Sequence, residues 1–174
     1  MGNPEGNKER EGFADAINRA AFGNERVLLR RRGRAIAAVV PLNDLRLLEA
    51  LEDRIDLVDA RAALAQANKK GAQSLDVILK ELGFWLHQAI STIFVAPPAE
   101  QQLYALAKPL RKLLVKRLHA LRTSPRPPGV TKLEGLDHLY RIREGDSRIV
   151  YAIREKDLLV LAIKNGARTD VPRS

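Results

Sequence analysis

The sequence predicts an α+β protein, in which amphipathic helices are combined with antiparallel strands. Near the C-terminus, short apolar strands alternate with arginines and are separated by two turns, Gly145-Asp146 and Glu155-Lys156-Asp157. Earlier in the chain, apolar residues recur at helical spacing. The length of 174 residues allows one ordinary domain or two small ones, and the hydrophobic content of 45% is sufficient for a packed core.

The charge is distributed unevenly along the chain. Residues 1–83 carry 14 Lys and Arg against 13 Asp and Glu, whereas residues 84–174 carry 16 against 8. Such an excess of positive charge indicates a polyanionic partner for the second half. The alternative is a basic surface that serves only to keep the protein in solution.

Composition excludes several classes of protein. Cysteine is absent, which rules out disulfides and thiolate chemistry. No apolar run approaches the length of a membrane span, and residues 1–10 lack the apolar region of a signal peptide. We therefore expect a cytoplasmic protein with no membrane partner, no metal site and no cofactor.

The first predicted helix spans residues 10–23. Phe13, Ile17 and either Ala20 or Ala21 fall on one face of it, and Gly23 ends it. The preceding residues 1–9 have no apolar periodicity, so we expect them to be disordered.

A β-hairpin and a long helix are predicted next. Strands over residues 26–31 and 35–40 flank an Arg32-Gly33 turn, and Pro41 ends the second strand. A long amphipathic helix, capped by Asn43 or Asp44, then continues to Lys69-Lys70-Gly71.

A second, short helix is predicted between Ser74 and Gly83. Ser74 is a good N-cap, Asp76 favours the helix dipole, and Gly83 can end the helix. A helix of about two turns is unstable alone in water, so we expect this one to exist only when docked. Its apolar side chains, together with Phe84 just beyond its end, are expected to form the docking surface. They are Leu75, Ile78, Leu79, Leu82 and Phe84.

The remaining elements are a strand, a helical hairpin and three further strands. The strand covers residues 91–96, and the helical hairpin bends at Pro109. The last strands are predicted over residues 138–143, 148–153 and 158–164. Alternation along the first of these places Arg141 and Arg143 on one side of the sheet.

The first half resembles the Phd/YefM antitoxin family. The stretch FADAINRAAFGNERVLLRRRGRAIAAVVPLNDLRLLEAL carries this resemblance, and SLDVILKELG resembles the distal helix with which such antitoxins wrap their toxin. The family's opening apolar strand is missing here. The resemblance implies dimerisation and contact with the phosphates of operator DNA. The arginines expected to make that contact are Arg10, Arg19, Arg30, Arg31, Arg32 and Arg34.

The second half resembles a RelE/YoeB-like toxin of the RelE/ParE superfamily. The stretch YRIREGDSRIVY is its most specific part. The resemblance implies a helical hairpin packed on a twisted antiparallel sheet, and a ribonuclease that cuts ribosome-bound mRNA. The implied catalytic residues are Arg141, Arg143, Arg148 and Arg168, with Arg126 and Lys132 as further RNA contacts. Arginines of this kind can neutralise the charge that grows on the phosphorane.

Proton transfer is where the sequence departs from the family pattern. Pro172 stands where an aromatic residue often follows the last arginine, and Ser147 stands where an aromatic commonly precedes Arg148. His138, Tyr140 and Glu144 are the candidate substitutes. The sequence is therefore consistent with an active, a weakened or an inactive ribonuclease in the second half.

The expected domains are a disordered tail (1–9), an antitoxin-like domain (10–68), a neutralising helix with linker (69–90) and a toxin-like domain (91–174). We expect a self-neutralised toxin–antitoxin fusion. We expect a homodimer, because the hairpin and long helix of the first domain are too thin to bury their own apolar faces. The linker over residues 84–90 spans at most about 25 Å, so the neutralising helix can dock on its own toxin half or be exchanged with a second copy. Two alternatives are an inactive fusion that acts as a DNA-binding autoregulator, and a ParE-like toxin that acts on a protein target.

Overall fold

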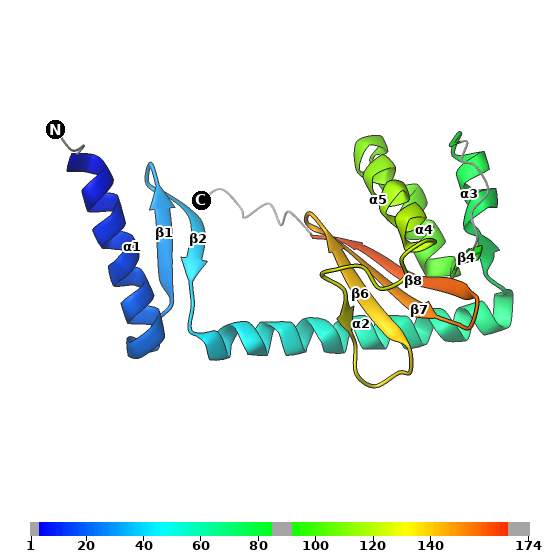
Figure 1. The fold of residues 1–174 in the computed structure, drawn as a ribbon, viewed down its shortest axis with the longest axis horizontal. Coiled ribbons are helices and arrows are strands. Elements are labelled where there is room, and N and C mark those ends of the chain that lie inside the picture. Colours follow the sequence, from blue (N-terminus) through cyan, green and yellow to red (C-terminus); the bar gives the residue numbers. More distant parts are fainter. Residues whose placement is uncertain (1–3, 85–91, 167–174) are drawn as a thin grey trace. The chain divides into compact units, whose positions relative to one another are not determined.

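The computed structural model describes residues 4–84 and 92–166, with side chains from Gly12 onward (Figure 1). The chain divides into two compact units, Met1–Glu52 and Asp53–Ser174. The division falls inside the long helix α2 (Leu42–Lys70). The antitoxin-like domain expected over residues 10–68 thus contributes its last part, from Asp53 onward, to the second unit.

The first unit contains helix α1 (Pro4–Gly23) and the start of α2. Helix α1 begins at Pro4, inside the segment expected to be disordered. Proline is well tolerated in the first turn of a helix, and the Glu, Lys and Arg residues that follow are good helix formers. Helix α2 begins one residue before Asn43 and two before Asp44, the two predicted N-caps. The Asp44 carboxylate pairs with Arg26 rather than capping the helix.

Strands β1 (Val27–Arg31) and β2 (Arg34–Val39) form the predicted hairpin. Their register pairs Val27 with Val39 and Arg31 with Arg34. The turn residues Arg32 and Gly33 both have positive φ, 50° and 76°, as a two-residue type I′ turn requires. The Arg-Gly turn and both strands were therefore predicted correctly.

The second unit is built on a six-stranded sheet in the order β3-β4-β8-β7-β6-β5. The prediction of an antiparallel sheet is wrong in one place, because β4 runs parallel to β8. Parallel neighbours need a long connection, and here two helices and three strands lie between them along the chain. The bounds are β3 Gln73–Ser74, β4 Thr92–Val95, β5 Thr131–Lys132, β6 Leu139–Glu144, β7 Ser147–Ile153 and β8 Asp157–Asn165.

Three helices of this unit follow the sequence signals closely. Helix α3 (Leu75–Glu81) has Ser74 as its N-cap, whose hydroxyl accepts a hydrogen bond from the Asp76 N–H at 3.3 Å. Gly83, at φ 78°, ends it as predicted. The helical hairpin consists of α4 (Pro97–Ala105) and α5 (Lys108–Leu121).

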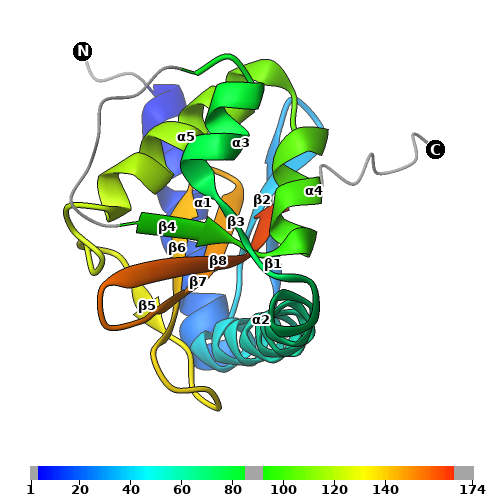
Figure 2. The same ribbon diagram turned by 90° about the vertical axis from the view of Figure 1, so that its right-hand side faces the viewer.

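The two faces of the sheet have separate apolar layers. Figure 2 shows α3, α4 and α5 on one side of the sheet and α2 on the other. On the helical-hairpin side, Leu118 of α5 packs in one layer with Ile142 and Ile149 of the sheet. On the α2 side, Ala60 and Ala63 pack with Val150 and Leu159. The sheet is therefore buried on both faces.

Helix α2 meets the sheet through small residues. Ala60, Ala63 and Ala67 are buried at i, i+3, i+7 spacing, and Asp56 continues the same stripe one turn earlier. Leu57 and Leu64 are partly buried against this layer, whereas the other large apolar residues of the helix are exposed. They are Leu42, Leu45, Leu47, Leu48, Leu51, Ile55 and Val58.

Candidate phosphate-binding site on the sheet

Four cations lie on the face of the sheet that α2 covers. On β6, Tyr140 and Ile142 pack toward α5, so Arg141 and Arg143 point the other way, toward the α2 side. The register then pairs Arg143 with Arg148, and Arg148 with Lys164. The predicted common face of Arg141 and Arg143 is thus present in the structure, and it extends across three strands.

Lys164 reaches this face because of a β-bulge in β8. Val150 pairs with Ala162 while Tyr151 pairs with Val160, which leaves Leu161 as the extra residue. Leu161 and Ala162 consequently both join the α2-side layer, and the alternation of β8 shifts by one residue. Simple alternation from Leu159 would have pointed Lys164 to the opposite face.

Three carboxylates of α2 face these cations. The Asp56 side chain is fully buried, and its Oδ1 accepts a hydrogen bond from Arg148 Nε at 2.9 Å. Arg141 Nη1 lies 3.3 Å from Asp56 Oδ2 and 2.5 Å from Asp53 Oδ1. Lys164 Nζ lies 3.4 Å from Asp56 Oδ1 and also pairs with Asp59. A buried carboxylate is stable only when it is paired in this way.

The remaining arginines predicted to be catalytic are placed differently. Arg143 shares the face but its side chain is exposed. Arg168 lies outside the described residues, as does Pro172. Ser147 is buried, and its hydroxyl donates to Asn165 Oδ1 at 3.1 Å. A small hydroxyl side chain thus links β7 to β8 at this position.

The two predicted RNA contacts do not join the cations that pair with Asp56. Arg126 Nε donates to the Tyr140 hydroxyl at 3.0 Å, and its guanidinium lies 5.2 Å from the centre of that ring. Tyr140 packs in the layer on the α5 side. Lys132 is exposed on β5, where it pairs with Tyr140 in register.

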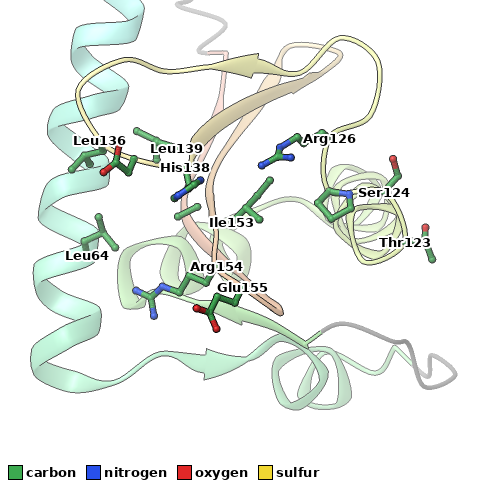
Figure 3. A pocket seen from close by; sticks show the side chains of 13 residues that line it. Leu64, Thr123, Ser124, Arg126, Leu136, His138, Leu139, Ile153, Arg154 and Glu155 are labelled. Carbon is green, nitrogen blue, oxygen red and sulfur yellow. The ribbon is translucent and has the colours of Figure 1, made fainter.

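A cavity of about 890 Å³ lies at the start of β6 and the end of β7. Figure 3 shows His138 and Arg126 near its upper part, with Arg154 and Glu155 below them. Leu64 of α2 forms part of its wall. The His138 side chain is exposed here, which makes this imidazole accessible for proton transfer.

The other candidates for proton transfer are less available. The Tyr140 hydroxyl accepts from Arg126, and Glu144 pairs with Arg117 at 3.2 Å. Tyr151, which stacks beside Tyr140 at 6.0 Å, is fully buried and donates its hydroxyl hydrogen to the Pro125 carbonyl. Burial, with a smaller effect of Tyr140, raises the pKa of Tyr151 to about 12, so this phenol stays protonated at neutral pH.

The predicted neutralising helix packs on the opposite side of the sheet from Asp56. Leu75, Ile78 and Leu79 are buried in the layer that contains α5, while Leu82 and Phe84 pack at its edge. On the same helix, Asp76 forms an ion pair with the buried Arg122. The residues of α3 thus fasten this segment to the helical hairpin, and the carboxylates that face Arg141 and Arg148 come from α2.

The arginines predicted to bind DNA gather at the β1–β2 turn. Arg30, Arg31, Arg32 and Arg34 are all exposed there. Arg19 is engaged elsewhere, because it pairs with Glu25 at 2.6 Å, and this contact raises its pKa. The side chain of Arg10 lies outside the described part of the chain.

No group of His, Asp or Glu that could hold a metal ion occurs among the described residues. No helix in the described ranges is long and apolar enough to cross a membrane.

Comparison with known proteins identifies the class of the second half. Residues 93–169 match the family of the ParE toxin of the type II toxin–antitoxin system, parDE. This C-terminal region is thus a domain of the ParE/RelE toxin family. The match begins at Ile93, so α2 and α3 both lie outside it. A search of curated proteins gave no match.

Several solved structures resemble the same part of the chain. The RelE–RelB complex of the archaeon Pyrococcus horikoshii is 28% identical, covering 42% of this chain and 92% of that one, with a TM-score of 0.38. The isolated Escherichia coli RelE toxin is 28% identical, covering 45% and 87%, with a TM-score of 0.40. The intact E. coli RelBE complex is 28% identical, covering 44% and 96%, with a TM-score of 0.39.

Proposed function

We propose that the chain is a self-neutralised toxin–antitoxin fusion. Residues 91–174 act as a RelE-like interferase on ribosome-bound mRNA, residues 10–68 are the antitoxin module, and residues 69–90 supply the neutralising helix and linker. One observation carries the proposal. Asp56, which lies outside the toxin-family region, buries its carboxylate against Arg141 and Arg148 within that region.

The chemistry requires that those cations be accessible. Attack of a 2′-hydroxyl on the adjacent phosphate builds negative charge on the phosphorane, which fixed guanidinium groups stabilise. With Asp56 in place, Arg141 is only 5% exposed and cannot meet a phosphate. His138 is the side chain that we propose for proton transfer, since it is exposed beside a cavity while Tyr140 and Glu144 are engaged.

Neutralisation in this proposal has two parts on two faces of the domain. Helix α2 covers the cations, and Leu75, Ile78 and Leu79 of α3 hold the connecting segment on the helical-hairpin side. Covalent connection keeps the two halves at an effective concentration of roughly millimolar, so recapture after opening is fast. Free active toxin is therefore scarce.

Growth and mRNA cleavage test this function. The full chain is expected to be harmless in growing cells, whereas a chain with Asp53→Arg and Asp56→Arg, which repels α2 from the cations, should arrest growth and cleave translated mRNA. Adding Arg148→Ala should abolish both effects. Intact mRNA in a translating extract with this variant, shown to be folded by circular dichroism, would overturn the ribonuclease. Growth arrest with intact mRNA would favour a ParE-like action on a protein target.

A second role concerns the first unit, and the exposed hairpin favours it. Arg30, Arg31, Arg32 and Arg34 present four cations at a rigid two-residue turn. We propose that they contact the phosphates of operator DNA, so that the fusion regulates its own synthesis. If the second half proves inactive and the protein still binds operator DNA, autoregulation is its whole function.

We also propose that the first unit dimerises. Among its described residues, the buried apolar side chains are Ala16, Ala20 and Pro41, which is too little for an independent core. Phe22 and Ile36 are 88% and 63% exposed. A second copy of the chain is the expected partner, because the same apolar face is then covered on both molecules. Light scattering should give a dimer at micromolar concentration, and Phe22→Ser with Ile36→Ser should weaken it.

A further inference from the structure

The three carboxylates of α2 form a regular row. Asp53, Asp56 and Asp59 follow one another every three residues, so successive carboxylates are displaced by about 4.5 Å along the helix axis. Arg141 contacts the first two, and Lys164 contacts the last two. Three cations and three carboxylates thus balance one another in a single cluster, with Asp56 at its centre.

The position of Asp56 is one that packing alone does not call for. It continues the buried stripe of Ala60, Ala63 and Ala67, where a small apolar side chain would fit the same pattern. Replacing a buried ion pair by apolar groups is often neutral or stabilising. Packing of α2 on the sheet therefore does not by itself require charged side chains at these positions.

The chemistry of these cations points to a phosphate. A guanidinium binds the two oxygens of a carboxylate and two oxygens of a phosphate in the same geometry, and a lysine adds a point charge. Arg148 and Lys164 are register partners on adjacent strands, with Arg141 on the next strand along the sheet. Their three charges converge on the Asp56 carboxylate within 3.4 Å.

We infer that Arg141, Arg148 and Lys164 form one phosphate-binding cradle, in which the Asp56 carboxylate occupies the place of a phosphate of the RNA backbone. This inference rests on the proposed function for the nature of the substrate. It assigns a substrate-binding role to Lys164, which is not among the site residues predicted from the sequence. It also defines how neutralisation works, namely by an anion of the chain itself that competes with the substrate.

Competition has a measurable consequence. Because the Asp56 carboxylate and an RNA phosphate exclude each other, RNA binding and docking of α2 weaken one another by the same factor. Removing the charge of Asp56 should tighten RNA binding, and RNA should loosen α2.

The experiment measures binding of a short 2′-O-methyl RNA, which cannot be cleaved, to the full chain by fluorescence anisotropy. Asp56→Asn keeps the shape of the side chain but removes its charge, and is expected to tighten binding at least tenfold. Lys164→Ala in that background should reverse most of the gain and lower the slope of log affinity against log salt by about one. The matched control is Asp76→Asn, which likewise frees a buried arginine, Arg122, but on the other side of the sheet.

The inference is overturned if Asp56→Asn gains no more affinity than Asp76→Asn, or if Lys164→Ala leaves the gain intact. Wild-type protein supplies a second measurement that does not depend on any variant. Saturating RNA should speed hydrogen exchange at the amides of residues 53–67, and unchanged exchange would contradict competition. Tight RNA binding without cleavage of translated mRNA would contradict the proposed ribonuclease but not the phosphate-binding cradle. Cleavage of translated mRNA without an effect of Asp56→Asn on RNA binding would contradict the cradle but not the ribonuclease.

Discussion

Asp56 of α2 and Arg148 of β7 are joined by a 2.9 Å hydrogen bond between Oδ1 and Nε, although 92 positions separate them in the chain. The carboxylate has no exposed surface, and the guanidinium side chain is 18% exposed. This pair connects a helix that precedes the toxin-family region to the cationic face inside that region.

Loss of the Asp56 carboxylate should destabilise the second unit. Asp56→Ala leaves Arg141, Arg148 and Lys164 without their shared partner, and removing one side of a buried ion pair costs about 3–5 kcal/mol. Asp59→Ala is the control, because its side chain is 45% exposed and such pairs contribute at most about 1 kcal/mol. Urea denaturation of both variants measures the difference. Equal losses would contradict the central position of Asp56.

Tyr151 should make stability depend on pH in the alkaline range. Burial raises its pKa to about 12, against about 10 for an exposed tyrosine. Below pH 10 the phenol is protonated in both the folded and the unfolded state. Between about pH 10 and 12 only the unfolded state loses the proton, so the contribution of Tyr151 to stability is lost as the pH rises through this window.

The variant Tyr151→Phe tests this dependence. At pH 8 it should be less stable than wild type by about 1 kcal/mol, because the hydrogen bond to the Pro125 carbonyl is lost. At pH 11 the deficit should shrink, since the variant has no phenol to ionise. Denaturation at both pH values gives the two differences. A deficit that is the same at pH 8 and pH 11 would show that Tyr151 does not titrate in this window.

Gln102 should be needed to hold the end of β8. The last pair between β4 and β8 is Val95 with Val160, and beyond it the Ile163 N–H donates to Gln102 Oε1 at 2.6 Å. Gln102→Leu leaves this N–H without its partner, at a cost of about 1–3 kcal/mol. Gln101→Leu is the control, since Gln101 is exposed. Thermal unfolding should separate the two, and similar melting temperatures would argue against the role of Gln102.

The arginine hairpin should bind duplex DNA through phosphates. Arg31→Ala with Arg34→Ala is expected to weaken binding at every sequence and to lower the salt slope by about two, one for each phosphate contact. Lys80→Ala with Lys112→Ala removes the same charge from exposed positions in the second unit. Gel shifts at several salt concentrations compare the pairs. If both pairs of substitutions weaken binding equally, only the net charge of the protein matters.

The sequence predicted the local elements well, because their signals are local. Ser74 caps α3, the Arg32-Gly33 turn joins β1 to β2, and alternation places Arg141 beside Arg143. Each of these depends only on residues a few positions apart. The parallel pairing of β4 with β8 was not predicted, since nothing in either strand records which neighbour it will take.

Asp56 and Lys164, which meet at the centre of the cluster, were missed for a similar reason. The large apolar side chains of the long helix give the stronger sequence signal, but the stripe of Asp56, Ala60 and Ala63 is the one that meets the sheet. Small residues allow a helix to approach a sheet most closely. From the sequence alone, an aspartate among them is expected to be a solvent-exposed charge. Lys164 was missed because a bulge at Leu161 shifts its strand by one residue, and a bulge has no signature in this sequence.

The order of the elements along the chain determines the order in which the two sides of the cluster are synthesised. Helix α2 ends at Lys70, whereas the strands that carry the cations begin at Leu139. A ribosome therefore releases the acidic helix well before β8, at about 5–20 residues per second, and the sheet cannot close until β8 emerges between β4 and β7. In the proposed fusion, the carboxylates that cover Arg141 and Arg148 are therefore synthesised before the strands that carry these arginines, so the second unit never folds without its covering helix.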